Sequence, residues 1–277
     1  MVVTKRFGEC GPSDATHQFM SQRQIPLLAT VKATVSSSLD SLTLSSHLLG
    51  ERKVTINPAK EAESGVTYLA RIWSEVTETV DMGDKAAAFL AQIVEKDRDS
   101  PYKAMDIRLV MMKKDDRVAD DKYTPRASLG WFGGLPKVSL TDGFPVLIAS
   151  EASLEELNRR LLKKGKGAVP MSRFRPNIVV SGTKPFEEDS WKVISISGVL
   201  FHLVKGCPRC KQSCTDQYTG KVSEEPLETL SEFRAIGPIK ENVYFAQNAI
   251  AHDSGGTIRV GAAVHVLERG DPIFDRS

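Results

Sequence analysis

The chain has 277 residues, of which 41% are apolar and 26% are charged, and its formal net charge is +2. This composition predicts a globular protein with a full hydrophobic core, in one large domain or two small ones. So small a charge argues against nucleic-acid binding, and no run approaches the roughly 18 apolar residues of a membrane span. The four cysteines lack the spacing of a secreted disulfide scaffold. We therefore expect a soluble, intracellular protein with no membrane segment in this chain.

Short strand-like segments fill the first half of the chain. They are rich in β-branched or apolar residues and are bounded by Ser, Asp, Gly or Pro, which is typical of β-strands. A helix interrupts them after Gly83, where apolar residues recur with helical spacing up to Val94 and Asp84 is a candidate N-cap. The strand segments are 27–35, 42–44, 54–56 and 67–73 before this helix, and 107–112 and 146–149 after it.

The polar and then glycine-rich stretch 113–136 predicts a long surface loop. It divides the chain into two expected domains, residues 1–135 and 136–277.

The second half opens with an amphipathic helix. Ser153 and Glu156 have the spacing of a capping box, and Gly165 is placed to end the helix. The dipeptide Ser197-Gly198 suits a two-residue hairpin turn. Strands outnumber helices and do not alternate regularly with them, so we predict the α+β class, with a β-rich mixed barrel and attached helices. The strands expected in this half are 178–180, 193–196, 199–204 and 258–267.

Three of the four cysteines cluster at Cys207, Cys210 and Cys214. A thiolate is a soft metal ligand and a strong nucleophile, and neighbouring cations such as Arg209 and Lys211 lower its pKa, so chemistry is expected here. Four interpretations stay open: half of a zinc site without its second ligand pair, a thioredoxin-like redox motif outside its usual βαβ setting, inert buried cysteines, or one cysteine that serves as a metal or sulfur ligand.

A second candidate is the run from Arg173 through Arg175 to Asn177, which precedes an apolar strand. Guanidinium groups present a planar fork of donors, so the run suits a phosphate or carboxylate; otherwise it is a surface turn with solvated arginines. The acidic run 187–189 either pairs with these arginines or is a charged loop before a buried tryptophan. The sequence contains no serine-hydrolase elbow, P-loop or dinucleotide fingerprint.

These runs occur in an order that is shared with one family. They are 21–26, 81–84, 108–110 and 142–154 in the first part, and 172–180, 186–191, 207–210, 216–220, 225–234 and 245–248 in the second. In order and spacing the chain closely resembles the MOSC domain family, in particular the mitochondrial amidoxime-reducing component and its bacterial relatives, which are molybdenum cofactor proteins. The resemblance implies an amino-terminal MOSC-associated β-barrel half over 1–135 and a MOSC domain with the cofactor cysteine over 136–277.

The resemblance also implies site residues. It assigns the molybdenum-bound catalytic thiolate to Cys210 and contacts with the pterin and its phosphate to Arg175 and Asn177. It places Asp142 in a loop against the cofactor and Arg209 beside the anionic sulfur.

The start of the chain departs from the family pattern. The family opens with a strand pair before an Arg-Trp or Arg-Phe step, and this chain begins near that step, at Arg6-Phe7. We therefore expect the first strands to be missing and a barrel edge to be open. Arg6 is assigned as a remnant of the cofactor contacts.

The function implied is a molybdenum-cofactor (Mo-molybdopterin) oxidoreductase that reduces N-hydroxylated compounds, such as amidoximes and hydroxylamines, by two-electron removal of oxygen. We expect a separate electron donor, either cytochrome b5 with its NADH-dependent reductase or a ferredoxin or flavin reductase. The alternative is a cofactor-binding or sulfur-carrier module related to the carboxy-terminal domain of molybdenum cofactor sulfurase, in whose relatives another domain binds pyridoxal phosphate. The expected location is mitochondrial or cytoplasmic.

Overall fold

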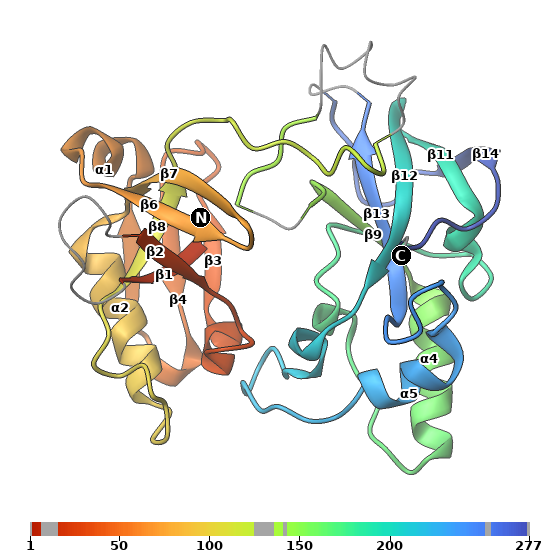
Figure 1. Cartoon of the computed structure of the whole chain (residues 1–277), viewed down its shortest axis with the longest axis horizontal. Helices are drawn as coiled ribbons and strands as arrows, with labels where there is room; N and C mark the ends of the chain where they lie inside the picture. The colour runs from red at the N-terminus through yellow and green to blue at the C-terminus, as the bar shows by residue number, and fades with distance from the viewer. Residues whose placement is uncertain (1, 7–15, 125–135, 141–142, 253–255, 276–277) are drawn as a thin grey trace. The chain divides into compact units, whose positions relative to one another are not determined.

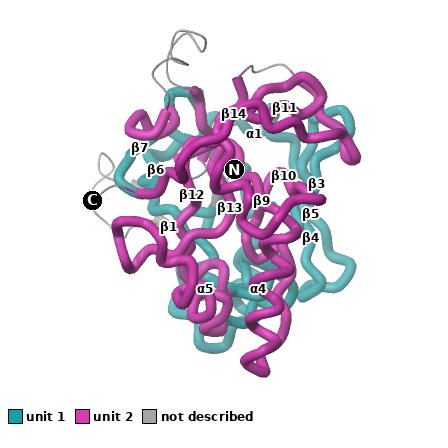
Figure 2. Tube along the Cα trace, turned by 90° about the vertical axis from the view of Figure 1, so that its right-hand side faces the viewer, with its two compact units in different colours: residues 1–117, 215–222 teal, residues 118–214, 223–277 magenta. Residues whose placement is uncertain are grey.

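Figure 1 shows the computed structural model of the chain, which describes residues 2–6, 16–124, 136–140, 143–252 and 256–275. The chain forms two compact units, coloured in Figure 2. Unit 1 contains residues 1–117 and 215–222, and unit 2 contains residues 118–214 and 223–277. The predicted domain boundary at residue 135 falls outside the described residues and stays a prediction.

Unit 1 is built on a closed barrel of five strands in the described part of the chain. β1 pairs antiparallel with both β2 and β8, β2 pairs parallel with β6, and β7 joins β6 to β8. The open edge that we expected is therefore not found among the described strands, because the sheet closes through β1. The five strands are β1 (Val2–Arg6), β2 (Thr16–Met20), β6 (Thr67–Ile72), β7 (Glu75–Asp81) and β8 (Ile107–Met112).

A small antiparallel sheet and two helices complete unit 1. Helix α2 buries its apolar face, including Phe89, Leu90 and Ile93, in the core of the unit. The elements are β3 (Lys32–Val35), β4 (Leu42–Ser45), β5 (Lys53–Ile56), α1 (Pro58–Ser64), α2 (Gly83–Glu95) and the 3-10 turns η1 (Pro26–Thr30) and η2 (His47–Leu49).

Two expectations about unit 1 are wrong in detail. Residues 27–30 are not strand, because Pro26, which has no N–H to donate to a sheet, opens a 3-10 turn there. Asp84 is not the N-cap of α2. The N-cap position is Met82, the Asp81 carboxylate accepts from the Gly83 N–H at 2.8 Å, and Asp84 pairs with Arg108 instead.

Residues 215–222 leave unit 2 directly after Cys214 and pack within unit 1. The side-chain amides of Gln217 and Gln22 exchange hydrogen bonds, and the ring of Tyr218 stacks on His47 at 4.3 Å between centroids. The cysteine cluster is therefore followed at once by a loop that belongs to the other unit.

Unit 2 is built on a mixed six-stranded sheet that curls into a half-barrel, in the order β10-β9-β13-β12-β11-β14. Only its β9–β10 pair is parallel within the described residues. With the closed barrel of unit 1, this confirms the predicted α+β class. The strands are β9 (Val146–Ser150), β10 (Ile178–Val180), β11 (Trp191–Ile196), β12 (Val199–Pro208), β13 (Tyr244–Ala251) and β14 (Val264–Arg269).

Helices and short turns connect these strands. The predicted hairpin turn is confirmed: Ser197 and Gly198 both have positive φ, 52° and 83°, as a type I′ turn between β11 and β12 requires. The expected strand 258–267 is strand only from Val264 onward. The helices are α4 (Glu151–Lys163) and α5 (Leu227–Arg234), which lie side by side (Figure 1), and the 3-10 turns are η3 (Met171–Arg173), η4 (Glu187–Ser190) and η5 (Lys211–Cys214).

The capping box predicted for α4 is wrong, although the helix is present. Strand β9 runs directly into the helix, so the N-cap is Ser150, and its side chain makes no capping bond. The Ser153 hydroxyl bonds the carboxylate of Glu188, at 2.7 and 2.9 Å from its two oxygens. Glu156 pairs with Arg160 one turn further along the helix.

The acidic run of η4 is engaged in contacts within unit 2. Glu187 pairs with Arg269 at 2.6 Å, and Asp189 pairs with the buried Arg234 at 2.7 Å. Glu188 is completely buried, and this burial raises the pKa of its carboxyl to about 7. When folding raises the pKa of an acid, the folded protein loses stability as the pH rises from the unfolded-state pKa to the folded-state pKa.

We therefore expect unfolding to depend on the titration of Glu188. Its pKa is 4.5 in the absence of burial and about 7 in the fold, so raising the pH from 5 to 8 should remove stability of about 3 kcal/mol at most. Glu188→Gln, which cannot ionise, should reduce the loss between these pH values, as measured by urea titration. Glu156→Gln is the matched control, because the pKa of Glu156 is lowered to about 2 by its hydrogen bond with Arg159. Identical pH dependence in the wild type and in Glu188→Gln would contradict the expectation.

Candidate functional site

The three clustered cysteines have different surroundings at the end of β12. The Cys207 thiol donates to the Pro208 carbonyl at 3.7 Å. The Cys214 thiol donates to the Glu224 carbonyl at 3.4 Å, and burial raises its pKa. Cys210 is half-buried, and its thiol has no hydrogen-bond partner among the described residues. Of the three thiols, that of Cys210 is therefore the one that combines partial exposure with the lack of a hydrogen-bond partner among the described residues.

Backbone hydrogen bonds hold the turn that carries Cys210. On one side, the Arg209 N–H donates to the Val243 carbonyl at 2.8 Å. On the other, the N–H and hydroxyl of Ser213 both donate to the Cys210 carbonyl, at 3.0 and 2.9 Å. The thiol therefore projects from a turn that is fixed at both ends.

The Arg209 guanidinium ties this turn to two other segments. Its Nε and Nη2 donate to the Phe245 carbonyl at 2.9 and 2.6 Å, and its Nη1 donates to the Phe174 carbonyl at 3.1 Å. The Phe174 and Phe245 rings stack with 3.9 Å between centroids, and both side chains are buried. One guanidinium thus joins the end of β12, the start of β13 and the arginine-rich run that precedes β10.

Arg173 makes a second link between the two sequence motifs. Its Nη1 donates to the Cys214 carbonyl at 2.9 Å, at the end of η5. The arginine-rich run and the cysteine cluster, far apart in the sequence, are therefore brought together by hydrogen bonds from Arg173 and Arg209.

Arg175 has a strained backbone and lies between two anchored residues, Phe174 and Asn177. Its φ is 55°, a left-handed conformation that costs a non-glycine residue roughly 1 kcal/mol or more. Phe174 before it is buried, and Asn177 after it is bonded to β9 in both directions. The Asn177 N–H donates to the Leu147 carbonyl at 2.9 Å, and the Asn177 side-chain oxygen accepts from the Leu147 N–H at 2.8 Å. Arg175 itself is exposed, so the strain is compatible with a functional position.

The structure thus brings Cys210, Arg209, Arg175 and Asn177 onto neighbouring segments of unit 2. Asp142 lies outside the described residues. Arg6 belongs to unit 1, at the end of β1, where its Cα pairs with His17 of β2. The roles assigned to these residues stay predictions.

The donor set fits the expected cofactor. Within the described residues, no three His, Cys, Asp or Glu side chains gather as a metal-binding group. A single thiolate suits a metal that carries further sulfur ligands of its own, as in a pterin dithiolene. The exposed Arg175 and Lys211 suit an anionic phosphate.

Sequence reasoning missed a buried polar cluster behind the site. Arg234 on α5 donates from Nε to the Tyr244 carbonyl at 2.8 Å and pairs with Asp189. The Gln247 side-chain amide donates to the same Asp189 carboxylate at 2.7 Å. This cluster fixes the start of β13, beside the Phe245 carbonyl that Arg209 uses. Its members are widely separated in the sequence, so no spacing pattern could have paired them.

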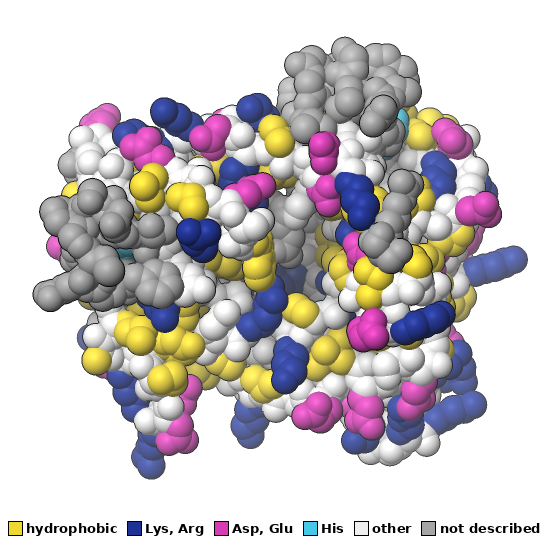
Figure 3. Space-filling model, viewed as in Figure 1, with side chains coloured by type: hydrophobic (Ala, Val, Ile, Leu, Met, Phe, Trp, Pro, Cys, Tyr) yellow, Lys and Arg dark blue, Asp and Glu magenta, His cyan; other side chains and the backbone are white. Residues whose placement is uncertain are grey.

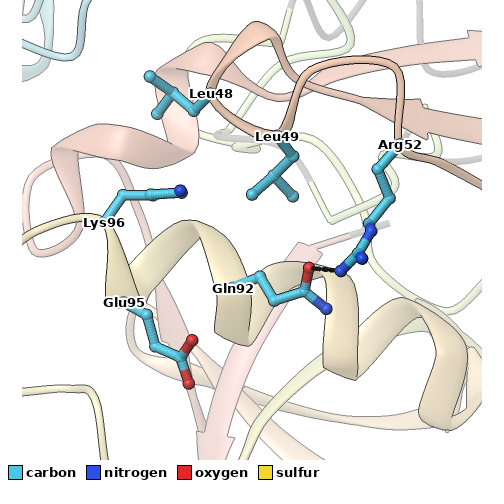
Figure 4. A pocket seen from close by; sticks show the side chains of 6 residues that line it. All are labelled: Leu48, Leu49, Arg52, Gln92, Glu95 and Lys96. Atoms are coloured by element: carbon cyan, nitrogen blue, oxygen red, sulfur yellow. Dashed lines mark hydrogen bonds between the residues drawn. The ribbon is translucent and has the colours of Figure 1, made fainter.

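The cavity drawn in Figure 4 belongs to unit 1 and not to the thiol site. It has a volume of about 480 Å³, lies between η2 and α2, and is crossed by a hydrogen bond from Arg52 to Gln92. It is lined by Leu48, Leu49, Arg52, Gln92, Glu95 and Lys96.

On the face of the molecule seen in Figure 3, basic and acidic side chains are interspersed, which agrees with the small net charge. None of the described helices is both long and apolar enough to cross a membrane.

Comparison with known proteins gives one family model and several relatives. The model described as MOSC domain matches residues 136–265. The chain is 31% identical over 254 residues to mitochondrial amidoxime-reducing component 1 of Homo sapiens, which covers 90% of this chain and 69% of that protein. It is 34% identical over 256 residues to mitochondrial amidoxime reducing component 2 of Bos taurus, with coverages of 91% and 68%. Molybdenum cofactor sulfurase of Danio rerio is 24% identical over 261 residues, with coverages of 90% and 29%.

The hydrogen bonds of Arg209 predict a measurable cost for its conservative replacement. In Arg209→Lys the ammonium cannot reproduce the fork to two carbonyls, so we expect a loss of about 1–3 kcal/mol in the free energy of unfolding, measured by urea titration. The matched control is Arg159→Lys on α4, whose exposed ion pair with Glu156 contributes little to stability, so the free energy of unfolding should stay close to that of the wild type. Equal effects of the two substitutions would show that Arg209 does not anchor the turn.

Proposed function

Because this chain belongs to the MOSC-domain family of the mitochondrial amidoxime-reducing components, we propose that it is a molybdenum-cofactor-dependent oxidoreductase that reduces N-hydroxylated compounds. The substrates would be amidoximes and hydroxylamines, which lose their N-bound oxygen as water at a cost of two electrons and two protons. When bound, the cofactor would supply the redox-active metal for this exchange.

One observation carries the proposal. The Cys210 thiol is half-buried, without a hydrogen-bond partner among the described residues, and lies in a turn that Arg209 anchors to the arginine-rich run. The other two clustered thiols donate to backbone carbonyls, so they have partners of their own. Cys210 would therefore be the thiolate ligand of the metal.

The remaining residues would bind or orient the cofactor. Arg175, exposed and conformationally constrained, would hold the phosphate, and Asn177 would hold the pterin through the amide nitrogen that its bond to Leu147 does not use. Arg209 has three N–H groups on carbonyls, so it would act mainly by positioning the turn. The family resemblance adds Asp142 and Arg6 as further cofactor contacts.

Electrons would come from a separate protein. We propose cytochrome b5 with its NADH-dependent reductase, or a ferredoxin or flavin reductase, as the donor. The names of the two amidoxime-reducing relatives place those proteins in mitochondria, and we propose a mitochondrial location for this chain.

A second candidate is a cofactor-binding or sulfur-carrier module. It is favoured by the relative named molybdenum cofactor sulfurase, because 90% of this chain aligns with only 29% of that protein. The chain would then correspond to one part of a larger enzyme.

Metal content and turnover of two cysteine variants test the proposal. The protein is purified from a host that makes the cofactor, molybdenum per chain is measured, and benzamidoxime reduction is followed with an artificial electron donor. We expect the wild type to bind metal and turn over, and Cys210→Ser to lose turnover by about 100-fold or more because the thiolate ligand is removed. Cys207→Ser is the matched control and should be milder.

Three other outcomes would change the proposed function or the assignment of Cys210. Metal without turnover in the wild type would favour the binding module over the reductase. Absence of metal from the wild type would contradict both functions. Equal loss in the two variants would contradict the assignment of Cys210.

A further inference from the structure

The C-terminal residues 273–275, here called the C-terminal strap, pack against the strand that leads into the cysteine cluster (Figure 1). The Gly206 N–H, one residue before Cys207, donates to the Ile273 carbonyl at 2.8 Å. The register of β12 against β13 is irregular between Gly206 and Pro208. The strap therefore supplies a hydrogen-bond partner at the point where the regular ladder is interrupted.

The Phe274 side chain fits against two glycines. A Cβ atom at Gly206 would lie 2.8 Å from the Phe274 Cδ1, and one at Gly237 would lie 3.0 Å from the Phe274 Cβ. A Cβ at Gly206 would clash with the Phe274 ring, and one at Gly237 would crowd both Tyr244 and Phe274, so the absence of side chains at these positions makes room for the strap. The Phe274 ring also packs on the Tyr244 ring, with 4.6 Å between centroids. Tyr244 is paired with Pro208 at the end of β12.

The Asp275 carboxylate adds hydrogen bonds and an ion pair to the contact between the strap and β12. Its carboxylate accepts from the Tyr244 hydroxyl at 3.1 Å and the Asn242 amide at 3.2 Å, and it pairs with Lys205. Lys205 lies on β12, is buried, and its ammonium is 4.5 Å from the centroid of the Tyr123 ring. A buried ammonium needs a partner, so loss of the Asp275 charge would be costly.

We propose that the C-terminal strap positions the Cys207–Cys210 turn, with Phe274 and Asp275 as the positioning residues. The strap fixes Lys205 and Gly206 immediately before the cluster and Tyr244 immediately opposite it. The functional consequence, retention of the cofactor at Cys210, rests on the proposed function. The mechanical consequence, restraint of the turn, does not.

The restraint is tested on the full chain made in a host that lacks the cofactor. The rate of iodoacetamide labelling of each cysteine is measured by peptide mass spectrometry, together with amide hydrogen exchange of residues 206–210. In Phe274→Ala we expect labelling of Cys210 and exchange of the turn to accelerate on the order of 10-fold, because local opening becomes easier. Labelling of Cys214, which is buried at the end of η5, should stay at the wild-type rate.

The contribution of the Asp275 charge is tested by a second variant and its control. Asp275→Asn should accelerate the same readouts, whereas Asp271→Asn, which changes an exposed acid just before the strap, should not. If Phe274→Ala accelerates Cys214 as much as Cys210, the variant has unfolded globally and the Asp275→Asn comparison decides. Wild-type rates at Cys210 in Phe274→Ala, or equal rates in Asp275→Asn and Asp271→Asn, would overturn the proposal.

Molybdenum content separates this proposal from the proposed function. In a host that makes the cofactor, Phe274→Ala should retain less metal per chain than the wild type after gel filtration. If the wild type holds no metal, the proposed function fails, while the labelling data still decide whether the strap restrains the turn. If the wild type holds metal and Phe274→Ala labels and retains metal as the wild type does, only the strap proposal fails.

Discussion

The hydrogen bonds from the Arg209 guanidinium to the Phe174 and Phe245 carbonyls are the interaction on which the candidate site depends. Together with the pairing of β12 with β13 and the Arg173 bond to the Cys214 carbonyl, they join the end of β12, the start of β13 and the arginine-rich run before β10. A buried carbonyl left without a donor costs free energy, so the guanidinium both satisfies these groups and sets their spacing. The positions of Cys210 and Arg175 relative to each other follow from this spacing.

The conformation of Arg175 shows what such anchoring makes possible. Arg175 precedes a proline, which disfavours helical backbone conformations at this position. Its positive φ adds strain, as it does for any residue that has a Cβ atom. The strain persists because Phe174 on one side is buried and Asn177 on the other is bonded to Leu147. A cationic side chain is thus presented at a fixed place by a backbone that does not relax.

Some local sequence signals predicted the local structure correctly and others did not. The hairpin turn at Ser197 and Gly198 and the helix that ends before Gly165 depend on backbone preferences of a few residues, and both are present. The capping box at Ser153 failed for a physical reason. A buried carboxylate, that of Glu188, competes for the same hydroxyl, and that carboxylate lies far along the chain.

Long-range structure was less accessible to prediction. Strand β7 combines β-branched residues with the acids Glu75, Glu78 and Asp81, and β13 mixes small and amide residues, so neither forms a continuous apolar run. The pairing of Asp189 with Arg234 and the closure of the barrel through β1 are equally invisible to spacing rules. The candidate site came from the order of motifs shared with a family, and the hydrogen bonds of Arg173 and Arg209 give the physical reason why those motifs belong together.

The loop 215–222 limits how this protein can be divided. The loop interrupts the sequence of unit 2 but belongs to unit 1, where Gln217 and Tyr218 have their partners, Gln22 and His47. A gene fragment that began after residue 117 would carry this loop without its hydrogen-bonding partner Gln22 and its stacking partner His47. Recombination that exchanged the thiol-bearing segment between proteins would therefore have to transfer the unit 1 residues that hold this loop as well.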